Sequence, residues 1–227
     1  AQLAGEFQGH VCECVENMHG NFVVQKCIEQ VPEEAAPFIV QEIEARVESI
    51  ATHVYGCRAV QRLLEHCRPC TIGSLKDRIV ENTLRLARDS YGNNVVRHLL
   101  EHGSEDDQRR IVRAVLQDVL ELAKSKSSSL VLEKCLEAVT AGAHARCLEA
   151  ERAALMRELL EGRGGASPPV QQIMLDRFGN YIVQRLIVRC RGPERELLKR
   201  RLAVAEPRLR RSPNGKHILA AIQREFG

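Results

Sequence analysis

The sequence has no apolar run that approaches the roughly 18 residues of a membrane-spanning helix, so we expect no membrane partner. Residues 1–10 lack the basic start and the apolar stretch of a signal peptide. The nine cysteines are an odd number and are scattered along the chain, which favours reduced thiols over a disulfide framework. Together these features predict a protein of the cytosol or nucleus, and we expect a cytoplasmic location.

Motifs for catalysis are missing as well, with no nucleophile motif, phosphate-binding loop or carboxylate pair. Cys67-Arg68-Pro69-Cys70 has the spacing of a redox motif, but no βαβ pattern surrounds it. The same thiols with His66 and His102 could suggest a zinc site, but no second Cys-x-x-Cys accompanies them. We therefore predict a protein that is not an enzyme and has no catalytic residue, cofactor or metal.

Neither sign of charge dominates, because 33 Lys and Arg stand against 30 Asp and Glu for a net charge of +3. A mildly basic chain permits an anionic partner without requiring one. Aromatic residues are scarce, at 4% with no Trp. An aromatic residue that recurs at one position of a pattern is therefore informative.

A hexapeptide recurs through the chain at a fixed period. Its copies open at residues 20, 56, 92 and 128, so three successive steps are 36 residues long. The next copy opens at 179, a step of 51, and a degenerate sixth copy opens at 215, again 36 later. A fixed period in this range is typical of a solenoid. The copies read Gly-Asn-Phe-Val-Val-Gln (20–25), Gly-Cys-Arg-Ala-Val-Gln (56–61), Gly-Asn-Asn-Val-Val-Arg (92–97), Ser-Ser-Leu-Val-Leu-Glu (128–133), Gly-Asn-Tyr-Ile-Val-Gln (179–184) and Gly-Lys-His-Ile-Leu-Ala (215–220).

Each unit has the same order of segments: a short apolar-periodic stretch, a second stretch opened by the hexapeptide, a turn, and a third amphipathic stretch. In the second unit, Val60, Leu63, Leu64 and Cys67 follow the i, i+3, i+4, i+7 spacing of a helix. Three helices per unit predict an all-α fold, an α-solenoid of stacked three-helix repeats. We expect one repeat domain over 1–227, with units at about 8–44, 45–81, 82–117, 118–167 and 168–203 and a C-terminal cap at 204–227.

The longer step contains 51 − 36 = 15 extra residues, which fall within 140–169. A helical pattern covers Ala145–Leu160, and a stretch rich in Gly and Pro follows at 162–169. We predict a lengthened third helix and a mobile loop here. Such loops often carry partner contacts, but the simpler interpretation, which we favour, is a tolerated surface insertion.

Two positions of the hexapeptide do not have the residue types of a core. In the five full copies the second residue is always small, and the sixth is long and polar with a planar head. Because they are four apart, they should project side by side from one helix face, while the residues between them, such as Val23 and Val24, should face the core. A merely solvated face would not keep this chemistry through five copies. We call the two positions a reader pair; the pairs are Asn21/Gln25, Cys57/Gln61, Asn93/Arg97, Ser129/Glu133 and Asn180/Gln184.

These segments resemble Pumilio (PUF) repeats over nearly the whole chain. The resemblance rests on Gly179–Gln184, Tyr55–Arg62, Leu132–Cys135 and Asn214–Leu219. It implies a protein that binds single-stranded RNA, with one base read by the second helix of each repeat. The five pairs follow the order of the last five of that family's eight repeats, which leaves open whether the sequence is a fragment or a short member.

The resemblance also implies post-transcriptional repression of messages through the 3′-UTR. It suggests repressor or deadenylation proteins as partners, bound at the convex face or at the 162–169 loop. The main alternative is a protein-binding solenoid of the HEAT or armadillo kind, in which the polar strip holds a peptide backbone.

The reader pairs complement the edges of particular bases. Uracil presents an acceptor, a donor and an acceptor, which two amides such as Asn180 and Gln184 can meet. Adenine suits Gln61 while Cys57 makes a close contact, and the two donors of guanine suit the acceptor-only carboxylate of Glu133. Since the family binds RNA antiparallel to the protein, the resemblance implies an element like 5′-UG(U/C)AU.

The third base stays open between U and C because of Arg97. Uracil needs an acceptor for its ring N–H, and a guanidinium has none. Cytosine offers two neighbouring acceptors, to which Arg97 could donate. Alternatively, Arg97 turns away to a phosphate and leaves the base to Asn93.

The residues next to the readers suggest two more roles. The third residue of each hexapeptide should be a platform on which a base stacks, worth about 1–3 kcal/mol per base for an aromatic ring. The residue after each reader should flank the phosphates, because four of these are cationic and the fifth is His. The platforms are Phe22, Arg58, Asn94, Leu130 and Tyr181, of which Asn94 and Leu130 should stack weakly, and the flanking residues are Lys26, Arg62, His98, Lys134 and Arg185.

Overall fold

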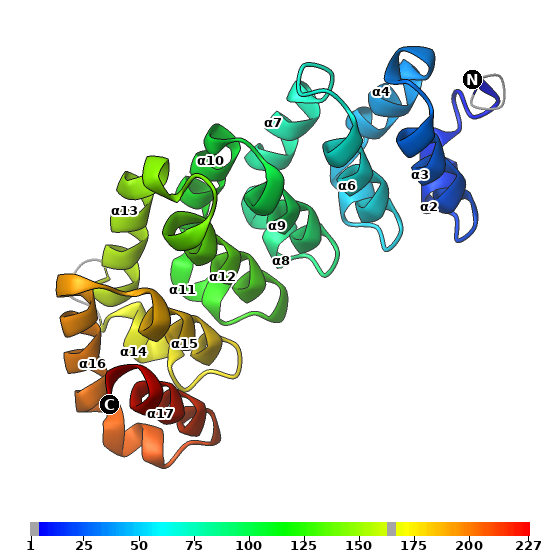
Figure 1. Cartoon of the computed structure of the whole chain (residues 1–227). Coiled ribbons are helices and arrows are strands. Elements are labelled where there is room, and N and C mark those ends of the chain that lie inside the picture. The colour runs from blue at the N-terminus through cyan, green and yellow to red at the C-terminus, as the bar shows by residue number, and fades with distance from the viewer. Residues whose placement is uncertain (1–4, 163–166) are drawn as a thin grey trace. The chain divides into compact units, whose positions relative to one another are not determined.

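The computed structural model describes residues 5–162 and 167–227, and within them the chain is helical (Figure 1). The first repeat contains α2 (Val11–Glu16), α3 (Gly20–Gln30), the 3-10 helix η1 (Glu33–Ala35) and α4 (Pro37–Ala45). The second contains α5 (Val47–Ala51), α6 (Gly56–His66) and α7 (Gly73–Glu81), and the third α8 (Thr83–Arg88), α9 (Gly92–His102) and α10 (Glu105–Val115).

The later repeats keep this order with longer elements. The fourth contains α11 (Val119–Ala123), α12 (Lys126–Ala141), the 3-10 helix η2 (Ala145–Leu148) and α13 (Glu149–Leu160). The fifth contains α14 (Pro169–Ile173), α15 (Gly179–Arg189) and α16 (Gly192–Arg210), and α17 (Pro213–Phe226) follows it. The expectation of an all-α solenoid with three helices per repeat is confirmed.

The helices divide into two compact units, Ala1–Asp107 and Gln108–Gly227, and each is described by itself. The sequence predicted one repeat domain without this division. In the first unit α3 packs on α6 and α6 on α9; in the second α12 packs on α15 and α15 on α17. Each hexapeptide therefore lies at or near the start of the helix that stacks on its neighbours. In Figure 1 these second helices lie side by side within each unit.

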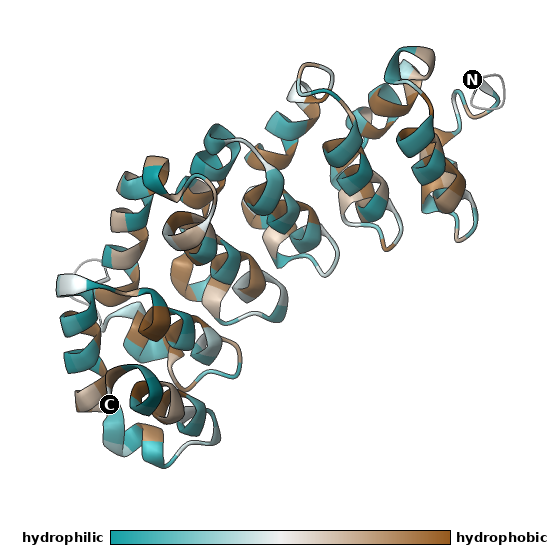
Figure 2. Ribbon diagram, viewed as in Figure 1, coloured by the Kyte–Doolittle hydropathy of each residue, from teal (hydrophilic) through white to brown (hydrophobic). Residues whose placement is uncertain are grey.

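The apolar positions between the readers form the core, as expected, with one exception. Ala59, Val95, Val131 and Ile182 have no exposed surface. Figure 2 shows that hydrophobic and hydrophilic stretches alternate along the helices. Val23 is 46% exposed, so the expectation that it faces the core is wrong. The reason is that α3 is the first of the stacked second helices, so no earlier second helix of the described chain covers this side.

A glycine opens most of the second helices because the preceding short helix approaches very closely. A Cβ at Gly20 would lie 2.6 Å from the carbonyl oxygen of Cys14, and one at Gly92 would lie 2.9 Å from that of Leu86. In the fourth repeat the position is Ser128, whose hydroxyl donates to the carbonyl of Leu122 at 2.8 Å. In each of these repeats, the first residue of the hexapeptide therefore lies against the residue six positions earlier in the chain.

The insertion in the fourth repeat is only partly what the sequence predicted. Residues 145–160 are helical, as expected, although the first turn is the 3-10 helix η2. Some of the additional length lies in α12, which continues to Ala141 because Ala138 and Val139 are buried. Of the expected 162–169 loop, residues 163–166 lie outside the described residues, and Pro169 already begins α14.

The C-terminal end contains one continuous helix where a boundary was expected. The division between the fifth unit and the cap, at 203/204, falls inside α16, which runs on through Pro207 to Arg210. Across the described parts of the chain, no helix combines the length and the apolar character needed to span a membrane.

Candidate nucleic-acid interface

In the first, third and fifth repeats, the start of the second helix is fixed by a side chain three residues before the hexapeptide. Asp89 Oδ1 accepts from the backbone N–H groups of Tyr91 and Gly92 at 2.8 and 2.7 Å. Asn17 and Asp176 do the same in the first and fifth repeats. These are side-chain caps of otherwise unpaired helix donors. Sequence reasoning overlooked them, although Asn or Asp at this spacing is the usual signal.

The second residue of the hexapeptide is buried, which the sequence did not lead us to expect. Asn21, Asn93 and Asn180 are 2–4% exposed. Asn21 Nδ2 donates to the carbonyls of Asn17 and Met18 at 2.9 and 2.8 Å, and Asn93 and Asn180 repeat this pattern. These asparagines therefore hold the turn before the helix, and their Oδ1 atoms remain free to orient the reader.

The sixth residue lies beside the second, as predicted, and is partly exposed. Gln25 Nε2 donates to Asn21 Oδ1 at 2.9 Å, and Gln184 Nε2 donates to Asn180 Oδ1 at the same distance. The amide of each Gln is thus fixed by its own helix. Its Oε1 and its second N–H remain available for an acceptor and a donor of a ligand.

The second repeat orients its reader in another way. Cys57 is 1% exposed and has no side-chain amide, and Gln61 Nε2 donates instead to the backbone carbonyl of Cys57 at 2.9 Å. Burial raises the pKa of the Cys57 thiol, so the group is neutral at pH 7. The pair therefore offers one oriented amide beside a small apolar surface.

The carboxylate of Glu133 is held by another repeat. Arg185 Nε on α15 donates to Glu133 Oε2 on α12 at 3.2 Å. The Glu133 side chain is 19% exposed, and the buried hydroxyl of Ser129 donates to the carbonyl of Lys126 at 3.3 Å. The sequence predicted that Arg185 lies near the phosphates and did not anticipate this ion pair.

In the third repeat, the side-chain oxygen of the second residue and the donors of the sixth residue have no partner within the described chain. Asn93 Oδ1 is buried without a hydrogen-bond partner. Arg97, four residues on, makes no hydrogen bond or ion pair within the described residues. This repeat therefore contains a buried acceptor without a donor, and the guanidinium donors of Arg97 are not used within the described residues.

The platform residues are mostly exposed, as stacking requires. Phe22 is 65%, Tyr181 55% and Leu130 40% exposed, and Arg58 is exposed as well. Asn94 is only partly exposed, and its Nδ2 donates to the carbonyl of Tyr91 at 3.1 Å. Exposed aromatic rings in a chain so poor in them suit a surface that contacts flat ligands.

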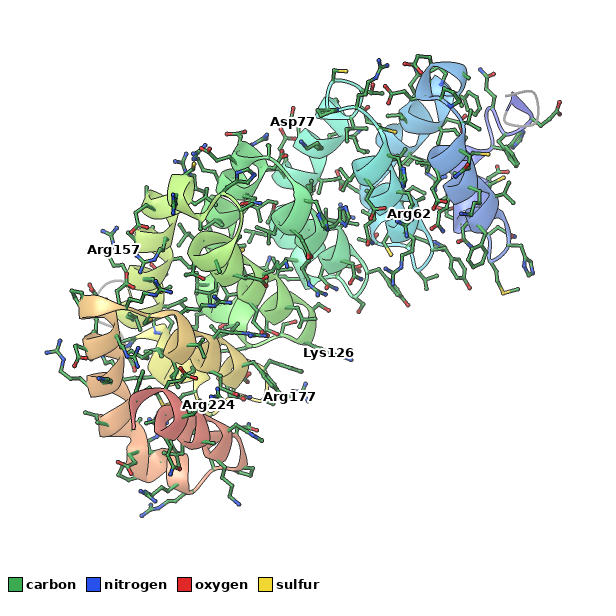
Figure 3. The ribbon with its side chains drawn as sticks, in the orientation of Figure 1. Arg62, Asp77, Lys126, Arg157, Arg177 and Arg224 are labelled. Carbon is green, nitrogen blue, oxygen red and sulfur yellow. The ribbon has the colours of Figure 1, made fainter. Side chains whose placement is uncertain are left out.

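The residues after the readers are engaged with acidic groups. Lys26 contacts Glu29 at 2.5 Å on its own helix. Arg62 reaches back to Glu29 of the first repeat at 3.4 Å, and Figure 3 shows it on α6. Lys134 contacts Glu137 at 3.4 Å. Contact of this row with phosphates stays a prediction, in which an incoming phosphate competes with these carboxylates.

His98, in the same row, has a buried ring. Its side chain is 10% exposed, and Nε2 lies 3.7 Å from Glu65 Oε1, too far for a hydrogen bond. Burial lowers the pKa of His98, outweighing the nearby carboxylate, so the ring is neutral at pH 7. A phosphate contact by His98 is disfavoured for that reason. His98 and His102 form a His-x-x-x-His spacing that was not considered in the prediction of a metal site, and their ring centroids lie 4.8 Å apart.

The other candidate chemistry has little support. Burial and the carboxylate of Glu33 raise the pKa of Cys67 to about 11, so this thiol is protonated and a poor nucleophile at neutral pH. In residues 5–162 and 167–227, no three His, Cys, Asp or Glu side chains converge as metal ligands would.

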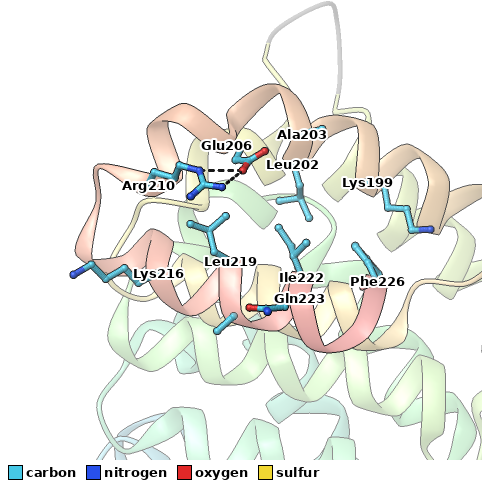
Figure 4. Close-up of a pocket in the computed structure, with 11 residues that line it drawn as sticks. Lys199, Leu202, Ala203, Glu206, Arg210, Lys216, Leu219, Ile222, Gln223 and Phe226 are labelled. Atoms are coloured by element: carbon cyan, nitrogen blue, oxygen red, sulfur yellow. Dashed lines mark hydrogen bonds and ion pairs between the residues drawn. The ribbon is translucent and has the colours of Figure 1, made fainter.

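A groove lined by none of the reader-pair residues lies near the C-terminal end of the chain. It measures about 740 Å³ and runs between α16 and α17, where Leu202, Leu219 and Ile222 project toward each other (Figure 4). Glu206 and Arg210 form an ion pair at 2.6 Å along its edge.

The fold and the site together define an all-α repeat protein that presents one polar reader pair per repeat. A family model described as the Pumilio-family RNA binding repeat matches residues 10–44, 46–69, 82–116, 118–149 and 170–199. The chain belongs to this family, as the sequence resemblance predicted.

Relatives and solved structures agree with this assignment. The chain is 29% identical over 222 residues to a Pumilio domain-containing protein of Schizosaccharomyces pombe, covering 98% of this chain and 31% of that protein. It is 28% identical over 213 residues to Pumilio homolog 12 of Arabidopsis thaliana, covering 93% and 33%. The chain thus spans about a third of the length of these relatives.

Among solved structures, the chain is similar to PUF-8 in complex with PBE-RNA. The TM-score is 0.86 at 34% identity, over 98% of this chain and 63% of that one. It is also similar to the Puf4 RNA-binding domain bound to the HO endonuclease RNA 3′ UTR recognition sequence. The TM-score there is 0.83 at 25% identity, over 96% of this chain and 67% of that one.

Proposed function

We propose that this chain binds single-stranded RNA through its reader pairs and recognises an element of the form 5′-UG(U/C)AU. The observation that carries the proposal is the geometry of the readers. Gln25, Gln61, Gln184 and Glu133 each present a partly exposed planar head that is already oriented by a hydrogen bond. A platform residue stands three positions before each of them.

The repeat order assigns one base to each pair, with the RNA antiparallel to the protein. The Asn180/Gln184 pair takes the 5′ uracil, Glu133 the guanine and Gln61 the adenine, with a second uracil at Asn21/Gln25. The fixed amide of a Gln offers an acceptor and a donor side by side, which fits the ring N–H and a carbonyl of uracil. The buried Asn supports this arrangement by holding the Gln. The third base is U or C.

The biological role we propose is post-transcriptional control of messages that carry this element in the 3′-UTR, in the cytoplasm. The support is the RNA named with the solved relatives, which includes a 3′ UTR recognition sequence. Repression would require protein partners, such as repressor or deadenylation factors, which we place on surfaces away from the readers.

Selection from randomised RNA, read by sequencing, tests the central proposal. We expect enrichment of 5′-UGUAU or 5′-UGCAU. Absence of any enriched motif would favour the alternative, a solenoid that binds protein segments.

A specificity switch at the fourth repeat tests the base assignment. Replacing Glu133 by Gln and Ser129 by Asn installs the amide pair of the fifth repeat and should move the preference at the second base from G to U. Loss of the carboxylate should cost roughly tenfold or more in guanine affinity, since hydrogen bonds to charged groups are worth about 1.5–3 kcal/mol. A double mutant that still selects G would show that the assignment of this repeat is wrong.

A further inference from the structure

The reader of the fourth repeat cannot be oriented in the way the three glutamine readers are. Gln25, Gln61 and Gln184 each donate an amide N–H to an acceptor of their own helix, one turn earlier. A carboxylate only accepts hydrogen bonds. Glu133 therefore needs a donor from outside its helix, and Ser129 does not provide one, because its hydroxyl donates to the carbonyl of Lys126.

Arg185 supplies this donor from the next repeat. Its Nε donates to Glu133 Oε2 at 3.2 Å, across a separation of 52 residues in the chain. The contact engages one oxygen, so Oε1 and the second lone pair of Oε2 remain for a ligand. A guanine edge requires such a pair of acceptors, since its ring N–H and amino group donate side by side.

Arg185 also offsets the repulsion between Glu133 and a neighbouring carboxylate. Glu137 lies one turn further along α12 and is paired with Lys134 at 3.4 Å. Two carboxylates at i and i+4 repel each other. The guanidinium of Arg185 offsets this repulsion and favours a conformation of Glu133 that stays at the reader position. Arg189, on the same helix, also lines the shallow depression around this pair.

We infer that Arg185 is a positioning residue for guanine recognition, acting through Glu133 rather than through a phosphate. The inference rests on the proposed function, in which Glu133 reads guanine. It also assigns this flanking cation a different role from Lys26, which occupies the same position in the first repeat and pairs with Glu29 instead of a reader.

The two roles predict different effects on binding. A phosphate contact contributes equally to the affinity for every base, and its removal lowers the salt dependence of binding. A contact that orients a reader contributes only when the matching base is present. The ratio of affinities for G and A at one position therefore separates them.

The test uses Arg185→Gln, Arg185→Lys and the matched control Lys26→Gln in a fluorescence anisotropy assay. The probes are RNAs that contain 5′-UGUAU with G, A or inosine at the second base; inosine lacks the amino group of guanine. Arg185→Gln should lower the G-over-A ratio roughly tenfold, as for a charge-assisted hydrogen bond, and Arg185→Lys should restore part of it. Lys26→Gln should leave this ratio unchanged, whatever it does to overall affinity.

A double-mutant cycle with Glu133→Gln completes the test. If Arg185 acts through Glu133, Arg185→Gln should not change the G-over-A ratio in the Glu133→Gln background. An equal loss of affinity for all bases on Arg185→Gln, or no loss, would overturn the inference. Because the Arg185 side chain is 59% exposed, the variant should fold, which circular dichroism verifies. A wild type without any preference for G would instead refute the base assignment under the proposed function.

Discussion

Replacing Arg97 by Gln should both sharpen base recognition and stabilise the fold. The third repeat has the residues for a reader pair, but Asn93 Oδ1 is buried without a partner and Arg97 makes no contact with it. In the first and fifth repeats a Gln at this position donates to the equivalent oxygen at 2.9 Å. A Gln at position 97 should form the same bond.

The magnitude for base recognition follows from the donors and acceptors. With Arg97 in place, the ring N–H of uracil faces further donors and has no acceptor. An unmet donor costs about 1–3 kcal/mol, or roughly 5- to 150-fold in affinity. If Arg97 turns away to a phosphate, we expect the wild type to bind 5′-UGUAU and 5′-UGCAU within about threefold of each other. If Arg97 donates directly to the base, we expect the wild type to favour C. Arg97→Gln should then favour U by roughly tenfold or more.

The stability effect provides an independent measurement. Pairing a buried acceptor should contribute about 1 kcal/mol, which corresponds to a rise in Tm of roughly 2–4 °C for a chain of this size. Differential scanning calorimetry without RNA measures it. The base preference and the Tm should change together if one hydrogen bond underlies both.

The assay compares affinities for the two RNAs on wild type, Arg97→Gln and the reverse exchange Gln184→Arg. The reverse exchange should weaken the preference for U at the first base while leaving the third base unchanged. A strong preference of the wild type for U at the third base, unaltered by Arg97→Gln, would refute the reasoning.

Three further predictions concern stacking, packing and pH. Tyr181→Ala and Phe22→Ala should each weaken RNA binding by about 1–3 kcal/mol with circular dichroism unchanged; unchanged affinity in both would remove the stacking proposal. Gly179→Ala should destabilise by about 1–3 kcal/mol in urea unfolding, because its Cβ would lie 2.5 Å from Ile173 Cβ, whereas Gly73→Ala, with nothing within 4 Å, should not. Burial raises the pKa of Asp107, but hydrogen bonds from Lys76 and Ser104 outweigh it and lower the pKa overall. The stability that Asp107→Asn removes, about 1–3 kcal/mol, should therefore be present at neutral pH and vanish as the pH falls below about 4; a difference that persists at pH 2 would contradict this.

The sequence predicted the features that depend on local spacing. The period of 36 residues and the helical pattern within each unit were enough for the repeat architecture. The spacing of four between Asn21 and Gln25 predicted their contact, because residues four apart on a helix are neighbours in any environment. Fold class and reader positions follow from such local rules.

The sequence did not predict the partners of individual side chains. Glu133 and Arg185 are 52 residues apart, and their contact depends on how α12 packs on α15. The burial of Asn21 depends on the turn before α3, whose carbonyls its amide satisfies. A polar residue that is small enough to fit under a turn looks the same in sequence as one that faces solvent. The exposed Val23 shows the converse, an apolar residue without a covering helix.

The way each reader is held also bears on how sharply each repeat can discriminate. Immobilising a rotamer-rich side chain on binding costs about 0.5–1.5 kcal/mol. Gln25, Gln61, Gln184 and Glu133 are fixed before any ligand arrives, three by their own helix and one by Arg185. They lose little further freedom on binding, and a wrong base must break an existing geometry. Arg97 has neither advantage, because it is free to follow whichever acceptor the ligand presents. Discrimination should therefore be sharp at four of the five bases and weak at the third, where the chain departs from its own repeat pattern.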